Sequence, residues 1–169
     1  MRLDHRDGPL IYVENSSGDG DMGFDASAIP EQLFGTWKQL SGRYVDIQTG
    51  EERPGLSQAP NGYIHFARNG RLFNMSVDSA RQKPAGPRAS DEEAQALFRT
   101  LIAYAGTFEV QGNSLLFDVD VSWNESWTGS RQLRTFELNG DDLKMSAEII
   151  NPMTGRPARH QLTFKKWSA

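Results

Sequence analysis

Cysteine is absent from all 169 residues of the sequence. Its absence excludes a disulfide framework, a thiolate zinc site and a cysteine nucleophile. Positive charge is also scarce, since 18 Lys and Arg residues face 22 Asp and Glu residues and give a net charge of -4. No basic block offsets this balance, so we expect no nucleic-acid partner. No apolar run is long enough for a signal core or a membrane span, and we therefore expect a cytoplasmic protein with no membrane partner.

Histidine is rare as well, with His5, His65 and His160 far apart in the chain. Three histidines placed in this way do not form a metal-ligand motif. The sequence also has no phosphate-binding loop, dinucleotide-binding glycine pattern, nucleophile elbow or calcium loop. We therefore expect neither a metal nor a cofactor.

The length of 169 residues fits one domain with a sizeable core. Residues 1–28 differ in texture from the rest, because they hold one short apolar run, LIYVEN at 10–15, followed by a glycine-rich acidic stretch. We expect residues 1–28 to form an N-terminal arm that packs on the barrel predicted below or on a partner subunit, and residues 29–169 to form the main domain.

The main domain consists of short runs in which apolar and polar residues alternate, each ended by a turn signal such as Asn69-Gly70 or Asn139-Gly140. This punctuation is typical of an antiparallel meander, and eight strands are enough to close it. The sequence thus predicts an all-β, eight-stranded antiparallel up-and-down barrel with strands at 35–47, 62–67, 71–78, 106–111, 114–123, 130–139, 142–149 and 160–167.

One segment has a helical pattern instead, and it predicts a helix over 90–105. Ser90 and Glu93 form a capping box, and an apolar stripe at helical spacing follows. Gly106 provides a stop signal. The preceding loop contains Pro84 and Pro87 and is unsuited to a central strand. We expect the loop and helix to cap one opening of the barrel.

The order of five segments, GTW, NGYIHFARNGRLFNMSVDSAR, AYAGTFEV, VSWNESWTGSRQLRTFELNGDDL and LTFKKW, resembles the bacterial lipocalin-like domain family over residues 33–167. The resemblance implies a small barrel with an internal cavity. It also implies that Trp37 closes the narrow end of the barrel, with a basic residue, Lys165 or Lys166, across its indole ring. Relatives often carry histidines near Phe117 and Asp118, and this chain has none there, so chemistry that depends on them is not expected here.

The candidate catalytic residues are those that could move protons or hold negative charge. His65 could act as a general base, or it could be an ordinary half-buried strand histidine. Asp118 and Asp120 share one face of a strand, where the alternative is a solvated exterior. Arg134 shares its face with apolar residues, which is typical of a cavity wall with one polar anchor. Tyr104 is expected at the end of the helix, with its hydroxyl directed into the cavity.

Aromatic and polar residues on the same strand faces are candidates for ligand contacts. Several aromatic side chains facing one cavity would favour a flat or aromatic metabolite, although most of them could simply be core. The candidates are Tyr63, Phe73, Phe98, Trp123, Trp127, Gln132 and Phe136.

Three functions are consistent with these residues. The first is a cofactor-independent isomerase, cyclase or lyase of a small hydrophobic, oxygenated or aromatic metabolite, and the sequence leans narrowly towards it. The second is a carrier that binds such a molecule without turnover. The third is an assembly subunit, and a homodimer through the N-terminal arm would be one example.

Overall fold

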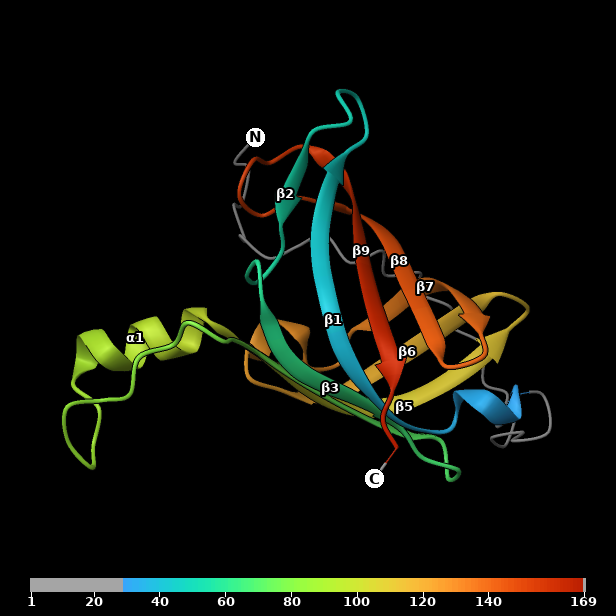
Figure 1. Cartoon of the computed structure of the whole chain (residues 1–169), viewed down its shortest axis with the longest axis horizontal. Helices are drawn as coiled ribbons and strands as arrows, with labels where there is room; N and C mark the ends of the chain where they lie inside the picture. The colour runs from blue at the N-terminus through green and yellow to red at the C-terminus, as the bar shows by residue number, and fades with distance from the viewer. Residues whose placement is uncertain (1–28, 169) are drawn as a thin grey trace, which may run out of the picture.

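The computed structural model describes residues 29–168, which form a closed antiparallel β-barrel (Figure 1). Eight strands make the barrel in up-and-down order, and a short ninth strand, β2, pairs with the last residues of β1. The predicted fold class is confirmed, whereas the run at 10–15 lies outside the described residues. The strands are β1 (Gly35–Asp46), β2 (Glu52–Pro54), β3 (Pro60–Phe66), β4 (Arg71–Asp78), β5 (Leu101–Gln111), β6 (Ser114–Ser122), β7 (Arg131–Asn139), β8 (Asp142–Ile150) and β9 (Pro157–Lys166).

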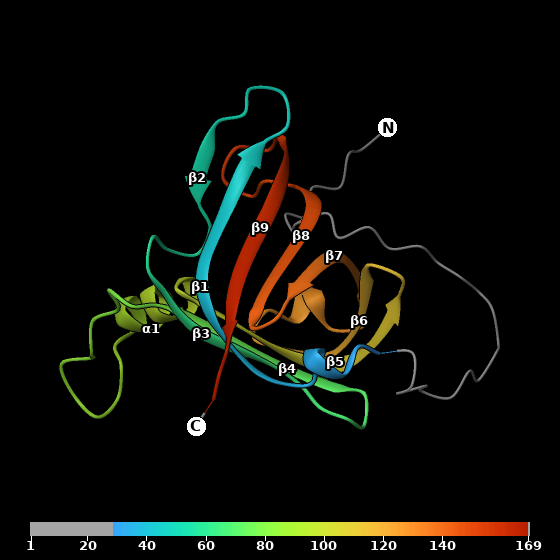
Figure 2. The same ribbon diagram turned by 45° about the vertical axis from the view of Figure 1, so that its right-hand side comes forward.

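Closure of the barrel depends on β1, which is long and pairs with different neighbours along its length. Its first residues pair with β3 and its last with β2, while β9 follows nearly the whole of its other edge. Figure 2 shows β1 and β9 side by side across the front of the barrel. The β1–β9 register shifts between Gln39 and Ser41, so the residues that face inward are Trp37 and Gln39 before the shift and Gly42 and Tyr44 after it.

One end of the barrel is filled by large apolar side chains, and Trp37 closes it. Trp37 is fully buried, and its Nε1 donates a hydrogen bond of 2.8 Å to the carbonyl oxygen of Leu33. Lys166 Nζ lies 4.4 Å from the centre of the indole ring and donates to the carbonyl oxygens of Gln32 and Phe34. Lys165 instead pairs with Asp142 outside the barrel. Trp37 is therefore a structural plug, and Lys166 is the cation across it.

The rest of this core comes from the plug-end halves of the strands and from the two residues in front of β1. Its members are apolar and nearly inaccessible to solvent: Leu33, Phe34, Ile64, Phe66, Leu72, Phe108, Leu115, Phe117, Phe136, Leu143, Met145 and Phe164.

The helix is shorter than the sequence predicted, because α1 covers Asp91–Arg99 and the chain enters β5 at Leu101. The capping box at Ser90 and Glu93 is present as expected. The apolar run after Arg99 fits both the helical period of 3.6 residues and the strand period of two. Pairing of β5 with β4 and β6 makes this run a strand. Gly106 is thus not a helix stop. It lies where β6 comes so close that a Cβ atom would be 1.9 Å from the Asp118 carbonyl oxygen.

The α1 helix has no buried residue, and it projects from the barrel beside the opening (Figures 1 and 2). Phe98 and Arg99, in its last turn, reach the mouth of the cavity described below. Within residues 29–168, no helix is long and apolar enough to cross a membrane.

Candidate functional site

The half of the barrel opposite the Trp37 plug encloses a cavity of about 450 Å³ that is open to solvent. Inward-facing residues on this half are small or polar, such as Gly42, Asn74 and Ser76, so they do not fill the interior as the phenylalanines do at the plug end. Apolar side chains dominate the wall and mouth: Leu56, Phe98, Leu101, Ile102, Trp123, Trp127, Ile149, Met153 and Leu162.

Arg134 lies on the floor of this cavity, with 8% of its surface exposed. Its guanidinium donates two hydrogen bonds of 2.9 Å, from Nη1 to the carbonyl oxygen of Leu133 and from Nη2 to Oε1 of Gln132. Gln132 is fully buried and is itself oriented by Ser130, whose Oγ lies 3.4 Å from its Nε2. No carboxylate of residues 29–168 forms an ion pair with Arg134.

Three further titratable side chains converge on Arg134 from other strands. His160 stacks on Tyr44, with ring centres 4.6 Å apart. Burial, together with the nearby Arg134 charge, lowers the pKa of His160 to about 3, so its imidazole is neutral at physiological pH. Burial raises the pKa of both Tyr44 and Tyr104, although Arg134 opposes the shift. Burial lowers the pKa of Arg134 itself, but an arginine in a protein keeps its proton. The guanidinium is therefore the charged group of this cluster.

Aromatic rings line the mouth of the cavity. Trp123 and Trp127 meet edge to face at 4.8 Å, and Phe98 lies 6.4 Å from Trp123. Tyr104 lies 5.7 Å from Trp127 and connects this group to the floor. The indole Nε1 of Trp127 is buried and has no hydrogen-bond partner within residues 29–168. Protein atoms cover this nitrogen, so it is the carbon part of the indole that is open to the cavity.

Three of the predicted catalytic residues lie outside the cavity. His65 is on the outer face of β3, between the buried Ile64 and Phe66, and its Nδ1 lies 2.9 Å from Thr36 Oγ1. Asp118 pairs with Arg131 at 2.6 Å and Asp120 with Arg71, both on the outer surface of the barrel. This placement matches the solvated alternative for the two carboxylates.

An extra residue in β6, Asp120, changes the face of the strand after Val119. Gly106 pairs with Val119 and Ala105 with Val121, so Asp120 is skipped and the alternation reverses. Val121 consequently faces outward, with 57% of its surface exposed, although Val119 is buried.

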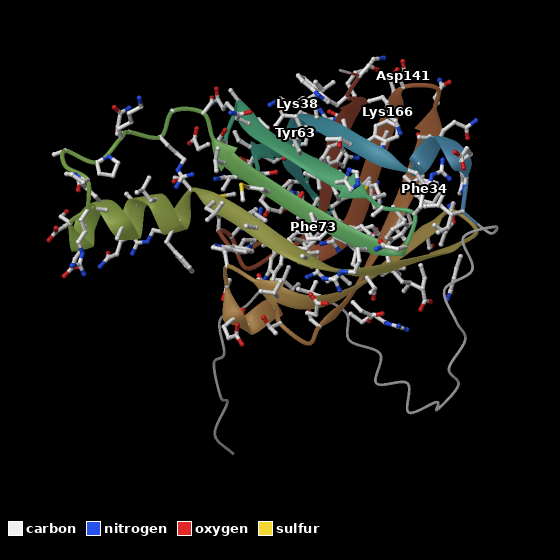
Figure 3. The ribbon with its side chains drawn as sticks, turned by 90° about the horizontal axis from the view of Figure 1, so that it is seen from below. Phe34, Lys38, Tyr63, Phe73, Asp141 and Lys166 are labelled. Atoms are coloured by element: carbon white, nitrogen blue, oxygen red, sulfur yellow. The ribbon has the colours of Figure 1, made fainter. Side chains whose placement is uncertain are left out.

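The predicted ligand-contact residues also divide between the cavity, the core and the outer surface. Phe98, Trp123 and Trp127 line the cavity, and Gln132 lies behind Arg134. Phe136 is part of the plug-end core. Tyr63 and Phe73 project from the outside of β3 and β4 (Figure 3), where they border a shallow open groove with Met75, Ala105 and Val121.

The cavity also contains residues that the sequence did not predict there, notably Tyr44, His160, Gln39 and Ser76. Gln39 and Ser76 hydrogen-bond to each other on the floor. Tyr44 and His160 face each other across the β1–β9 pair. The register shift in β1 hides this signal, because Tyr44 is an odd number of residues from Trp37 on the same face of the barrel.

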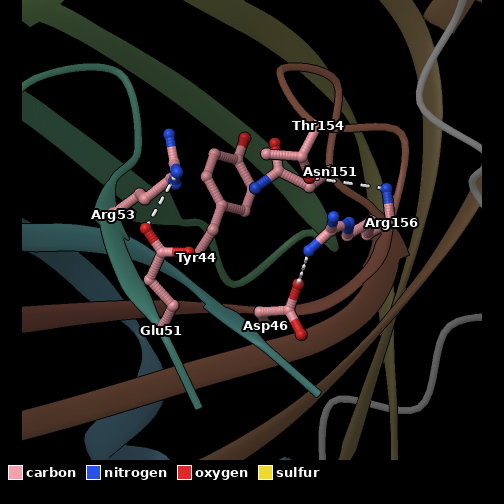
Figure 4. A pocket seen from close by; sticks show the side chains of 7 residues that line it. All are labelled: Tyr44, Asp46, Glu51, Arg53, Asn151, Thr154 and Arg156. Atoms are coloured by element: carbon pink, nitrogen blue, oxygen red, sulfur yellow. Dashed lines mark hydrogen bonds and ion pairs between the residues drawn. The ribbon is translucent and has the colours of Figure 1, made fainter. Parts of the chain in front are cut away.

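A second, smaller pocket of about 160 Å³ lies at the rim, between β1, β2 and the β8–β9 turn (Figure 4). Its charges are paired: Arg53 lies 2.8 Å from Glu51, and Arg156 lies 4.0 Å from Asp46. The charged side chains of this pocket are therefore already engaged with one another. As for metals, no three His, Asp or Glu side chains come together to hold an ion in the part of the chain described.

Known proteins provide a comparison for this fold. No curated protein matches the sequence significantly. A crystal structure of an uncharacterized protein from Bacteroides eggerthii DSM 20697 aligns with 80% of this chain and 99% of its own, at 11% sequence identity and a TM-score of 0.44. A family model, described as a lipocalin-like domain, matches residues 34–167. Because this match covers most of the sequence, from Phe34 in front of β1 to Trp167 after β9, the chain belongs to the lipocalin-like domain family.

Proposed function

We propose that the protein binds one small, largely apolar molecule inside its barrel, and that it acts as a binder or carrier. The observation that carries this proposal is the cavity of about 450 Å³, which is closed by a plug at one end, open at the other and lined mainly by apolar side chains. Its volume is in the range of about 300–1,000 Å³ typical of small-molecule sites.

The protonation states of the cavity residues favour binding over proton transfer. A general acid or base works best when its pKa is near the operating pH. The pKa of His160 is about 3, so this imidazole is a weak base. Burial raises the pKa of Tyr104, which makes its hydroxyl a weaker acid. His65, the candidate base, is on the outer face of β3.

The second candidate is the cofactor-independent isomerase, cyclase or lyase. It is favoured by one observation, the convergence of Tyr44, Tyr104 and His160 on the same guanidinium. Such an enzyme would use Arg134 to stabilise negative charge that develops on the substrate. Tyr104 would then be the nearest proton donor.

A probe of known structure tests the binding proposal. N-phenyl-1-naphthylamine is neutral and aromatic, and its fluorescence rises in an apolar environment. We expect the full chain to bind one molecule. Ile102→Trp fills the inside of β5 and should abolish binding, whereas Ala103→Trp adds the same side chain to the outer groove and should leave it intact.

The opposite pattern, loss of binding in Ala103→Trp alone, would contradict the proposal and place the site on the outer face. Turnover separates the two candidates once a natural ligand is extracted from the purified protein. A carrier returns that ligand chemically unchanged after long incubation, and an enzyme converts it.

A further inference from the structure

We infer that the ligand is a small organic anion, with an apolar and preferably aromatic body, whose anionic group lies against Arg134. This inference rests on the proposed function and specifies the chemical class of the ligand. A carboxylate, a sulfonate and an ionised enol share the chemistry that Arg134 would recognise, namely a negative charge spread over oxygen atoms.

Arg134 is buried without a counter-ion among the described residues. Its surface is 8% exposed, yet none of the carboxylates in residues 29–168 pairs with it. The arginines that do have a carboxylate partner are all more exposed: Arg43, Arg53, Arg68, Arg71, Arg131, Arg156 and Arg159. Buried charges in proteins are normally paired. A cation buried without a counter-ion at the floor of a binding cavity is explained if the ligand supplies that counter-ion.

The lining of the cavity differs in charge from the protein as a whole. Among the described residues, the lining contains two cationic side chains, Arg99 at the mouth and Arg134 on the floor, and no Asp or Glu. The protein as a whole has a net charge of -4, so this cavity is an exception to its overall charge. A positive, low-dielectric cleft attracts anions and repels cations.

Arg134 has more hydrogen-bond donors than it uses within the described residues. An arginine has five N–H donors in a planar fork, and two of these bond to Leu133 and Gln132. The remaining N–H groups of this fork are free to bind oxygen atoms of a ligand in the cavity that Arg134 lines.

The burial of the lining residues also determines how the ligand is oriented in the cavity. Arg134, Gln39 and Ser76 are the most buried members of the lining, while Phe98 and Arg99 are exposed. The anionic group therefore enters first and reaches the floor, and the apolar body lies against Trp123, Trp127 and Phe98 near the mouth.

Two probes with the same aromatic body isolate the contribution of the charge. 1-Anilinonaphthalene-8-sulfonate is N-phenyl-1-naphthylamine with a sulfonate added. Both are titrated by fluorescence into the parent protein, Arg134→Met, Arg134→Lys and the control Lys144→Met, which removes an exposed charge on the outside of β8. Should Arg134→Met fail to fold, Arg134→Gln serves as the neutral variant.

We expect Arg134→Met to weaken sulfonate binding roughly 10- to 100-fold, the range for a hydrogen bond to a charged group. Binding of the neutral probe should change by less than about threefold, Arg134→Lys should retain part of the sulfonate affinity, and Lys144→Met should behave like the parent protein. Equal effects of Arg134→Met on both probes, or none on either, would overturn the inference while leaving the proposed function intact. If the parent protein binds neither probe, the proposed function itself fails.

Discussion

Replacement of Arg134 by methionine is expected to stabilise the ligand-free protein. The guanidinium is buried without a carboxylate partner, and an uncompensated buried charge costs several kcal/mol. Methionine is of similar length and fills the space with apolar atoms. Against this gain, Oε1 of Gln132 loses the donor 2.9 Å away, which costs about 1–3 kcal/mol. The net effect is a gain of about 1–3 kcal/mol, or a rise in melting temperature of roughly 3–10 °C.

The measurement is thermal and urea denaturation of protein refolded without ligand, at neutral pH. The double variant Arg134→Met/Gln132→Leu also removes the orphaned acceptor and should be more stable than Arg134→Met alone. Lys144→Met, which removes an exposed charge, should change stability by less than about 0.5 kcal/mol. A clear fall in the melting temperature of both Arg134 variants would refute the reasoning, because it would mean that the guanidinium is fully compensated in the empty barrel.

Three other perturbations have definite expected outcomes. Because the folded-state pKa of His160 is depressed to about 3 from 6.5, the unfolded chain binds the proton first, and stability falls as pH drops below 6.5. Between pH 6.5 and about pH 5, the free energy of unfolding should fall by about 2 kcal/mol, as measured by denaturant titration. An equal dependence of stability on pH in His160→Phe would contradict this assignment. Lys166→Met should lower the free energy of unfolding by about 1–3 kcal/mol through loss of the Trp37 contact and two carbonyl bonds, whereas an equal loss in Lys165→Met would show that the plug is not the cause. Ser90→Ala removes the cap of a helix with no buried residue, so amide exchange in α1 should accelerate about fivefold, with no matching change in barrel melting temperature.

The barrel could be predicted from the sequence, because apolar and polar residues alternate in most strands. Turn signals then mark where one strand ends and the next begins. The strand at 71–78 matches β4 at both ends. The helix that continues to 105 was wrong from residue 100 onward, since Leu101, Ile102 and Tyr104 suit either period and the choice depends on pairing with β4 and β6. The short strand β2 was also missed, because its three exposed residues have no alternation to detect.

The site was harder to predict, because one extra residue in a strand reverses which face of the sheet each following side chain occupies. The irregularities near Leu40 and Asp120 have no distinctive sequence signal, and they determine which way Tyr44 and Val121 point. Arg134 could be found because its strand is regular and the arginine stands out between Gln132 and Phe136. The outward placement of His65 is readable from its own strand, because Ile64 and Phe66 form the apolar face of β3 and His65 alternates with them.

The most direct test of the central claim is a crystal structure of the full chain grown with N-phenyl-1-naphthylamine. The account predicts electron density for one probe molecule inside the barrel, in contact with Ile102, Tyr104 and Trp127, with the Trp37 plug unchanged. Density confined to the outer groove, over Phe73 and Ala103, with an empty interior would contradict it.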